Sequence, residues 1–191
     1  NYKFGFHAEY TTKREILEGI SELAQKYKAP VFTHSSETKS EVEGCIERYG
    51  KTPTELFEEL GLWNYGGGGY HSVWLSDNDM QIYKKRGLWA VINAGSNAKL
   101  ASGIADVQKM SNLGLNLAVG TDGPSSNNAL DMFREMYLIS ILQKLKHNDA
   151  AAMDANEILK AATVGSARCI GLDNCDCIAE GKLADLTVID L

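Results

Sequence analysis

The sequence predicts an α/β fold in which parallel strands alternate with helices. Two observations lead to this prediction. Short apolar runs of strand length recur along the chain, and each is followed by a polar loop and then by apolar residues at helical spacing. This alternation is typical of parallel strands joined by right-handed crossovers. The predicted strands end near residues 7, 34, 71, 93 and 122, so we expect about five strand–helix units.

The first units are bounded by threonine and proline. Residues 4–6 form the first predicted strand, and a helix is expected to begin at Thr11 or Thr12. This helix must end before Pro30, because proline cannot continue a helix. Residues 31–33 then form the second predicted strand, which leads into a polar loop and another helix.

The middle of the chain carries clear helix signals. Residues 52–55 (Thr-Pro-Thr-Glu) combine a cap, a proline in the first turn and an acid three residues after the cap. Ser76, with Asp79 three residues later, opens a further helix that Gly87 ends. The glycine run at residues 66–69 has two interpretations: it lets the backbone approach a ligand, or it forms a loose turn.

The last part of the chain changes character. Residues 115–119 form the fifth predicted strand, and Asn127 and Asn128 are expected to cap the long apolar helix that follows. A second helix is predicted from about residue 154 to residue 168. Residues 181–190 are interpreted as a turn that leads into one more strand of a different kind.

Composition narrows the class of protein. A chain of 191 residues fits one domain with a sizeable core. The net charge of −6, without a basic tract, argues against a nucleic-acid partner. No run approaches the length of a membrane span, and the pattern of a secretory signal is absent. Four scattered cysteines do not form a disulfide scaffold, so we expect a cytoplasmic protein.

The histidines point to a functional site. Three of the four, His7, His34 and His71, fall at the ends of successive predicted strands, and Asp122 holds the same position after a later strand. His147 lies in a polar stretch and is interpreted as surface. Asp122 alone fits equally well a turn residue that satisfies backbone donors. Because the carboxyl ends of parallel strands open onto one crevice, the four residues together favour a shared pocket.

The residue types in this pocket indicate metal chemistry. Imidazole and carboxylate groups are ligands for a divalent transition metal, with zinc the first expectation. A catalytic zinc keeps an open position for water and lowers the pKa of that water towards neutrality. Glu37, three residues beyond His34, is placed to carry a proton rather than to bind the metal. The alternative is that Glu37 only places a charge at the N-terminus of the next helix.

Six segments closely resemble motifs of the amidohydrolase superfamily, in the same order along the chain. The most similar branch is that of the aminohydrolases, which includes S-adenosylhomocysteine and methylthioadenosine deaminases and chlorohydrolases. The segments are Phe6–Thr11, His34–Thr38, Tyr70–Leu75, Asn93–Gly103, Gly120–Met132 and Ala179–Leu186.

The resemblance implies a TIM-type (β/α)₈ barrel with one divalent metal, zinc first and iron as the alternative. His34 and Asp122 are then metal ligands, and Asp122 also takes a proton from the attacking water. Glu37 contacts the substrate and moves a proton to its ring nitrogen, while His71 bonds the water and stabilises the tetrahedral intermediate. His7 contacts the substrate. The implied reaction is hydrolytic deamination, or dechlorination, of a small heterocycle such as an adenosine-type nucleoside, guanine or a triazine.

The chain also departs from the family pattern. The His-x-His pair of the family's first strand is missing, and five strand–helix units cannot close a barrel of eight. We therefore expect the C-terminal portion of a larger enzyme, with a partial barrel over residues 1–172 and the beginning of a small β domain over residues 173–191. On its own it is expected to be inactive. Open sheet edges predict a homo-oligomer or self-association.

Two rival interpretations remain. A binuclear cyclic amidohydrolase of the dihydroorotase or hydantoinase type uses a carboxylated lysine at the end of the fourth strand. Here that strand ends at His7, and Lys3 lies near its beginning, which disfavours this class. A non-catalytic domain of the same fold is the second rival. Four residues argue against it when they occur together, since a scaffold needs none of them: His34, Glu37, His71 and Asp122.

Overall fold

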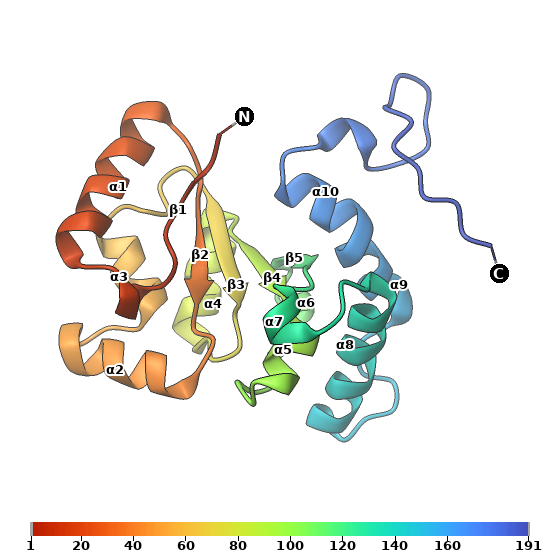
Figure 1. Cartoon of the computed structure of the whole chain (residues 1–191), viewed down its shortest axis with the longest axis horizontal. Helices are drawn as coiled ribbons and strands as arrows, with labels where there is room; N and C mark the ends of the chain where they lie inside the picture. Colours follow the sequence, from red (N-terminus) through yellow and green to blue (C-terminus); the bar gives the residue numbers. More distant parts are fainter. Residues whose placement is uncertain (1, 191) are drawn as a thin grey trace.

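The computed structural model describes residues 2–190, which contain one sheet of five parallel strands in the order β1-β2-β3-β4-β5 (Figure 1). Each strand pairs with the next one along the chain. The five predicted strand–helix units and the parallel sheet are therefore confirmed. The strands are β1 Phe4–Gly5, β2 Val31–Ser35, β3 Gly67–His71, β4 Trp89–Ile92 and β5 Asn116–Val119.

Helices follow the strands along the chain. Figure 1 shows α1, α2 and α3 at the β1 end of the sheet, and α8, α9 and α10 at the β5 end. Within residues 2–190 no helix has the length and apolar character needed to cross a membrane. The helices are α1 Arg14–Tyr27, α2 Lys39–Tyr49, α3 Pro53–Glu59, α4 Asp77–Arg86, α5 Ala94–Lys99, α6 Val107–Asn112, α7 Pro124–Asn127, α8 Met132–His147, α9 Ala155–Lys160 and α10 Ser166–Cys169.

Two predicted helix starts are confirmed by their caps, whereas the first helix begins at Arg14, after Lys13, and not at Thr11 or Thr12. The Thr52 side chain accepts a hydrogen bond from the backbone N–H of Glu55, the third residue of α3. The Ser76 side chain accepts in the same way from the N–H of Asp79, the third residue of α4. The start of α8 was predicted wrongly. Residues 124–127 form the short helix α7, which ends at Asn128 in the left-handed conformation (φ 66°). Asp131 caps α8 instead and accepts from the N–H groups of its first turn.

The sheet has two different faces. Side chains alternate along each strand, so Val31 packs against the helices while Phe32 points to the other face. The helix side holds the main core, including Leu17, Phe57 and Tyr83, which are almost completely buried. The opposite face carries a small cluster of Phe32, Val91, Ala118 and Cys169, with Tyr70 and Trp89 beside it.

The glycine run is not a loose turn, because most of it lies inside β3. Gly67 has a φ of 117°, and a Cβ there would overlap the backbone of Val31. A Cβ on Gly68 would overlap the backbone of Trp89. Glycine is therefore required for β3 to lie between its two neighbours.

A helical segment covers the outer edge of β5. The Ser166 hydroxyl lies 3.1 Å from the backbone N and 3.3 Å from the backbone O of Val119. The preceding π-helical turn Ala161–Gly165 brings Gly165 against the backbone oxygen of Leu117, where a side chain would not fit. This edge is therefore partly satisfied, which removes part of the reason to expect pairing through it.

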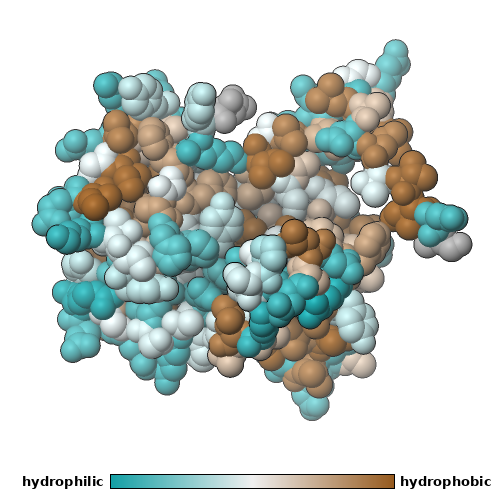
Figure 2. Space-filling view, in the orientation of Figure 1, coloured by the Kyte–Doolittle hydropathy of each residue, from teal (hydrophilic) through white to brown (hydrophobic). Residues whose placement is uncertain are grey.

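The strand predicted within residues 181–190 does not form. A turn at Asp173–Cys175 precedes an irregular segment, in which Val188 is 93% exposed and Leu183 N–H bonds the Asn174 oxygen. A strand needs a neighbouring strand for its backbone groups, and none of the described strands lies beside this segment. Figure 2 shows its apolar side chains exposed at the right of the view. Asn1 and Leu191 lie outside the described residues, and the division at residue 172 stays a prediction.

Candidate functional site

A cavity of about 240 Å³ lies at the carboxyl ends of the strands. His34 reaches it from the end of β2, His71 from the end of β3 and Asp122 from the loop after β5. The structure thus brings together three of the predicted site residues from distant parts of the chain. The full lining is His34, Tyr70, His71, Val91, Asn93, Gly120 and Asp122.

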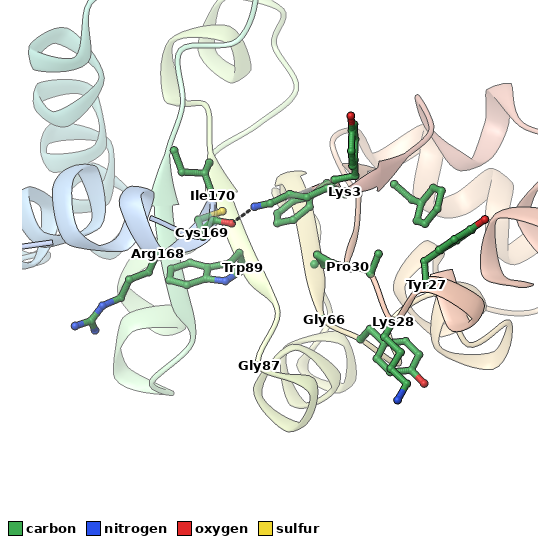
Figure 3. Close-up of a pocket in the computed structure, with 17 residues that line it drawn as sticks. Lys3, Tyr27, Lys28, Pro30, Gly66, Gly87, Trp89, Arg168, Cys169 and Ile170 are labelled. Atoms are coloured by element: carbon green, nitrogen blue, oxygen red, sulfur yellow. Dashed lines mark hydrogen bonds between the residues drawn. The ribbon is translucent and has the colours of Figure 1, made fainter. Parts of the chain in front are cut away.

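A larger cavity of about 880 Å³ lies at the opposite, amino ends of the strands (Figure 3). Its walls include Trp89 and Arg168, and Lys3 crosses it to donate a hydrogen bond of 2.5 Å to the backbone oxygen of Cys169. None of the predicted site residues lines this cavity. The chemistry therefore belongs to the smaller cavity.

The backbone oxygen of His7 orients the His34 ring. Nδ1 of His34 lies 2.7 Å from this oxygen, which also accepts from the Thr33 hydroxyl and from the His34 backbone N–H. A carbonyl only accepts, so Nδ1 carries the proton and Nε2 keeps a free lone pair. The His7 ring is exposed and lies beside the His34 ring, with 4.7 Å between their centroids.

His71 is buried and held from two sides. Its Nδ1 lies 2.8 Å from Asn97 Oδ1, and its backbone N–H donates to Asn93 Oδ1. Burial lowers the pKa of His71, although Glu37 and the Asn97 bond act in the opposite direction. The ring stacks on His34 at 5.4 Å between centroids. A neutral His71 with its proton on Nδ1 therefore keeps Nε2 as an acceptor.

Glu37 lies next to His71 and is not the acid that caps its own helix. Oε2 of Glu37 is 3.7 Å from His71 Nε2, and Oε1 accepts from the Ser102 hydroxyl at 3.2 Å. The carboxyl group of Glu41 instead accepts from the N–H groups of Ser36 and Glu37 at the start of α2. Glu41, and not Glu37, therefore takes the helix-capping role at the start of α2.

Asp122 has a positive φ of 61° and a well-satisfied carboxyl group. Oδ2 accepts from the hydroxyls of Ser96 and Ser126 at 2.6 and 2.7 Å, and Oδ1 from the Gly123 N–H. Burial acts to raise the pKa of Asp122, but these three hydrogen bonds outweigh it and lower the pKa. The group is therefore an ionised carboxylate at neutral pH.

Sequence reasoning assigned no role to the residues that hold these groups. Asn93, Ser96 and Asn97 belong to helix α5, which spans residues 94–99 directly after β4 and has Asn93 in its N-cap position. Their spacing of i, i+3 and i+4 directly after a strand end was the available signal, because it places them on one side of a helix. Ser102 lies in a loop and Ser126 in the short helix α7, and neither gave such a signal.

The donors fit part of a metal site. Nε2 of His34 and the carboxylate of Asp122 are ligand types that zinc accepts, and the bond from His34 Nδ1 to a carbonyl is the usual support for a ligating imidazole. No group of three His, Cys, Asp or Glu side chains in residues 2–190 has the arrangement of a complete metal site. The chain thus supplies two ligand candidates and not a full set.

Histidines and an aspartate at the carboxyl ends of a parallel sheet define the class of α/β barrel hydrolases that bind a metal at that end. Residues 1–191 match the sequence profile of the Amidohydrolase family along their whole length, and the chain belongs to this family.

Similar proteins include deaminases. The 5-methylthioadenosine/S-adenosylhomocysteine deaminase of Pyrococcus furiosus is 44% identical over 191 residues, which are 100% of this chain and 45% of that protein. The deaminase of the same name from Thermococcus sibiricus is 42% identical over 99% of this chain and 44% of its own length. The crystal structure of an adenosine deaminase from Xanthomonas campestris with bound zinc has a TM-score of 0.90 and 38% identity, and covers 96% of this chain and 42% of its own. The chain therefore spans less than half of these proteins, and it corresponds to part of their barrel.

Proposed function

We propose that this chain carries part of the active site of a metal-dependent aminohydrolase that deaminates adenosine-type nucleosides. This part lies at the carboxyl ends of strands β2 to β5. The observation that supports this most is the common cavity of His34, His71 and Asp122, with Glu37 3.7 Å from His71. The deaminase names of the relatives support an adenosine-type substrate. Dechlorination of a triazine is the second candidate, since it needs the same water and the same proton carrier.

His34, through Nε2, and Asp122 would hold one divalent metal, for which zinc is the first candidate and iron the second. When bound, such a metal lowers the pKa of a water that it coordinates towards neutrality. Further ligands would have to come from outside these residues, which span less than half of the relatives' length. The hydrogen bond from His34 Nδ1–H to the His7 backbone oxygen suits that task, because it keeps Nε2 available.

Each remaining side chain has a defined task in the hydrolysis. Neutral His71 would accept a hydrogen bond from the attacking water at Nε2, and Asp122 would take one proton of that water. Glu37 would deliver a proton to the ring nitrogen next to the reacting carbon. A C–O bond forms, the proton on Asp122 passes to the exocyclic amino group, the C–N bond breaks and ammonia leaves, while the remaining hydroxyl proton returns to Glu37. His7, exposed beside His34, would contact the substrate at the rim.

A chimera tests the proposal directly. Residues 1–191 replace the equivalent part of the Pyrococcus furiosus relative, and ammonia release from 5-methylthioadenosine, adenosine and a chlorotriazine is followed with zinc present. We expect deamination by the chimera, none by residues 1–191 alone, and loss of activity on Asp122→Asn. A folded, zinc-loaded chimera without deaminase activity would contradict the proposal, and activity restricted to the chlorotriazine would favour the second candidate.

The proposal also includes self-association of the chain and a reducing compartment as its location. The outer edge of β1 is the edge through which copies would pair, because Ser166 and the π-helical turn cover β5. All four cysteines are free, which suits the cytoplasm. Sedimentation of the chain at several concentrations tests the first point, and a purely monomeric chain would refute it.

A further inference from the structure

We propose that Glu135 is a positioning residue that braces the helix holding both Asp122 and His71. The importance of this role for catalysis rests on the proposed function, whereas the experiment that tests it does not. Glu135 lies on α8, is completely buried and does not line the site cavity. None of the ion pairs found within residues 2–190 involves it.

Both oxygens of Glu135 are used, and each holds a different segment of the site. Oε2 accepts from the Gly95 N–H at 2.8 Å, in the first turn of α5. Oε1 accepts from Nδ2 of Asn127 at 2.7 Å, on α7. The three residues are packed without spare room, because a Cβ on Gly95 would overlap both Glu135 and Asn127.

Glu135 does the work that a helix cap normally does. Asn93 precedes α5 in the N-cap position, but its side chain makes no capping bond and accepts from the His71 N–H instead. The first N–H groups of a helix need partners from outside the helix. Glu135 supplies one from another helix, which frees Asn93 to hold the end of β3.

The braced helix is the one that holds the reacting groups. Ser96 of α5 donates to Asp122 Oδ2, and Asn97 of α5 accepts from His71 Nδ1. On the other side, Nδ2 of Asn127 also donates to the backbone oxygen of Thr121, next to Asp122. Two acceptors therefore fix the orientation of the Asn127 amide, whose buried Oδ1 has no partner.

The substitution Glu135→Gln tests this arrangement with little change of shape. One carboxyl oxygen becomes an NH₂ group, which faces an N–H donor whichever way the amide turns. Either Gly95 or Asn127 then loses its acceptor. Because both bonds brace the start of α5, loss of either one is expected to make the Gly95 amide exchange with solvent about tenfold faster or more.

The experiment is NMR on metal-free residues 1–191 at about pH 8, above the ordinary imidazole pKa. Amide exchange at Gly95 and the ¹⁵N signals of the His71 ring are recorded. In the wild-type protein we expect a protected Gly95 amide and the Nδ1–H form of His71. In Glu135→Gln we expect faster exchange at Gly95 and a mixture of the two neutral forms of His71.

Asp79→Asn is the matched control. Asp79 is also buried and also accepts at a helix start, on α4, from Thr52 and from Ser76 N–H, but it touches no site residue. This variant should leave Gly95 and His71 unchanged. Equal effects of both variants, or no effect of Glu135→Gln, would overturn the proposal. If Glu135→Gln does not fold, the wild-type measurement still decides, because rapid exchange at Gly95 would refute the brace. Deaminase activity plays no part in these readouts.

Discussion

Nδ1 of His34 lies 2.7 Å from the backbone oxygen of His7, so the end of β1 sets the orientation of the imidazole at the end of β2. The bond decides which ring nitrogen remains free. It also gives the first strand a function beyond packing, because the His7 backbone orients a ligand candidate while the His7 ring stays exposed.

Removal of His34 should weaken zinc binding. In the chimera, His34→Ala removes a proposed ligand, and we expect the zinc dissociation constant to rise by about 100-fold or more, since even indirect supports of a ligand are worth 10–100-fold. Calorimetric titration measures the effect. His147→Ala is the control, because His147 pairs with Asp106 on the surface. Equal zinc affinities of both variants would contradict the ligand role.

Removal of the Glu37 charge should affect the reaction and spare the metal. Glu37→Gln in the chimera is expected to lower kcat by about 10²- to 10⁴-fold, the usual contribution of a positioned proton carrier, with unchanged zinc content. Glu43→Gln, on the exposed side of α2, should have no effect. A loss of zinc from Glu37→Gln would mean that the residue acts on the metal.

Stability of the metal-free chain should fall as the pH falls through the histidine range. Burial lowers the pKa of His71 in the folded state, so the unfolded chain binds a proton at a higher pH than the folded one. The free energy of unfolding therefore decreases from the ordinary imidazole pKa of about 6.5 downwards until folded His71 also titrates. Urea unfolding at about pH 7.5 and 5.5 tests this expectation. His71→Gln should show a smaller difference between the two pH values, and an equal difference would contradict the sign.

Two glycine substitutions should have opposite effects on stability. Gly68→Ala places a methyl group against the Trp89 backbone and should cost about 1–3 kcal/mol. Gly19→Ala lies in α1 with open space around it and should stabilise the chain by about 0.5–1 kcal/mol. Thermal unfolding compares them. If Gly68→Ala left the stability unchanged, a methyl group would fit beside the Trp89 backbone, and the close packing of β3 against β4 would be contradicted.

The elements that sequence predicted well depend on local signals. Thr52 and Ser76 carry complete capping boxes, and Gly87 ends α4, so each boundary is encoded within a few residues. The positions of His34, His71 and Asp122 were predictable for a different reason. Parallel strands bring their carboxyl ends to one edge of the sheet, so a residue's place at a strand end fixes its neighbourhood.

The errors arose where partners distant in the sequence decide the structure. Asparagine is a common helix cap, yet the side chain of Asn127 is buried and donates to Glu135 and to the Thr121 backbone oxygen. Residues 181–190 were predicted to lead into a strand, but none of the described strands lies beside them. The capping bond at the start of α5 comes from Glu135 on α8, and nothing in the local sequence indicates this partner.

The most direct test of the account is anomalous diffraction at the zinc absorption edge from crystals of the zinc-loaded chimera. We predict one zinc peak at bonding distance, about 2.0–2.2 Å, from both Nε2 of His34 and a carboxylate oxygen of Asp122. A zinc bound elsewhere, or at this cavity without either of these two atoms, would contradict the claim that the strand ends of this chain form a metal site.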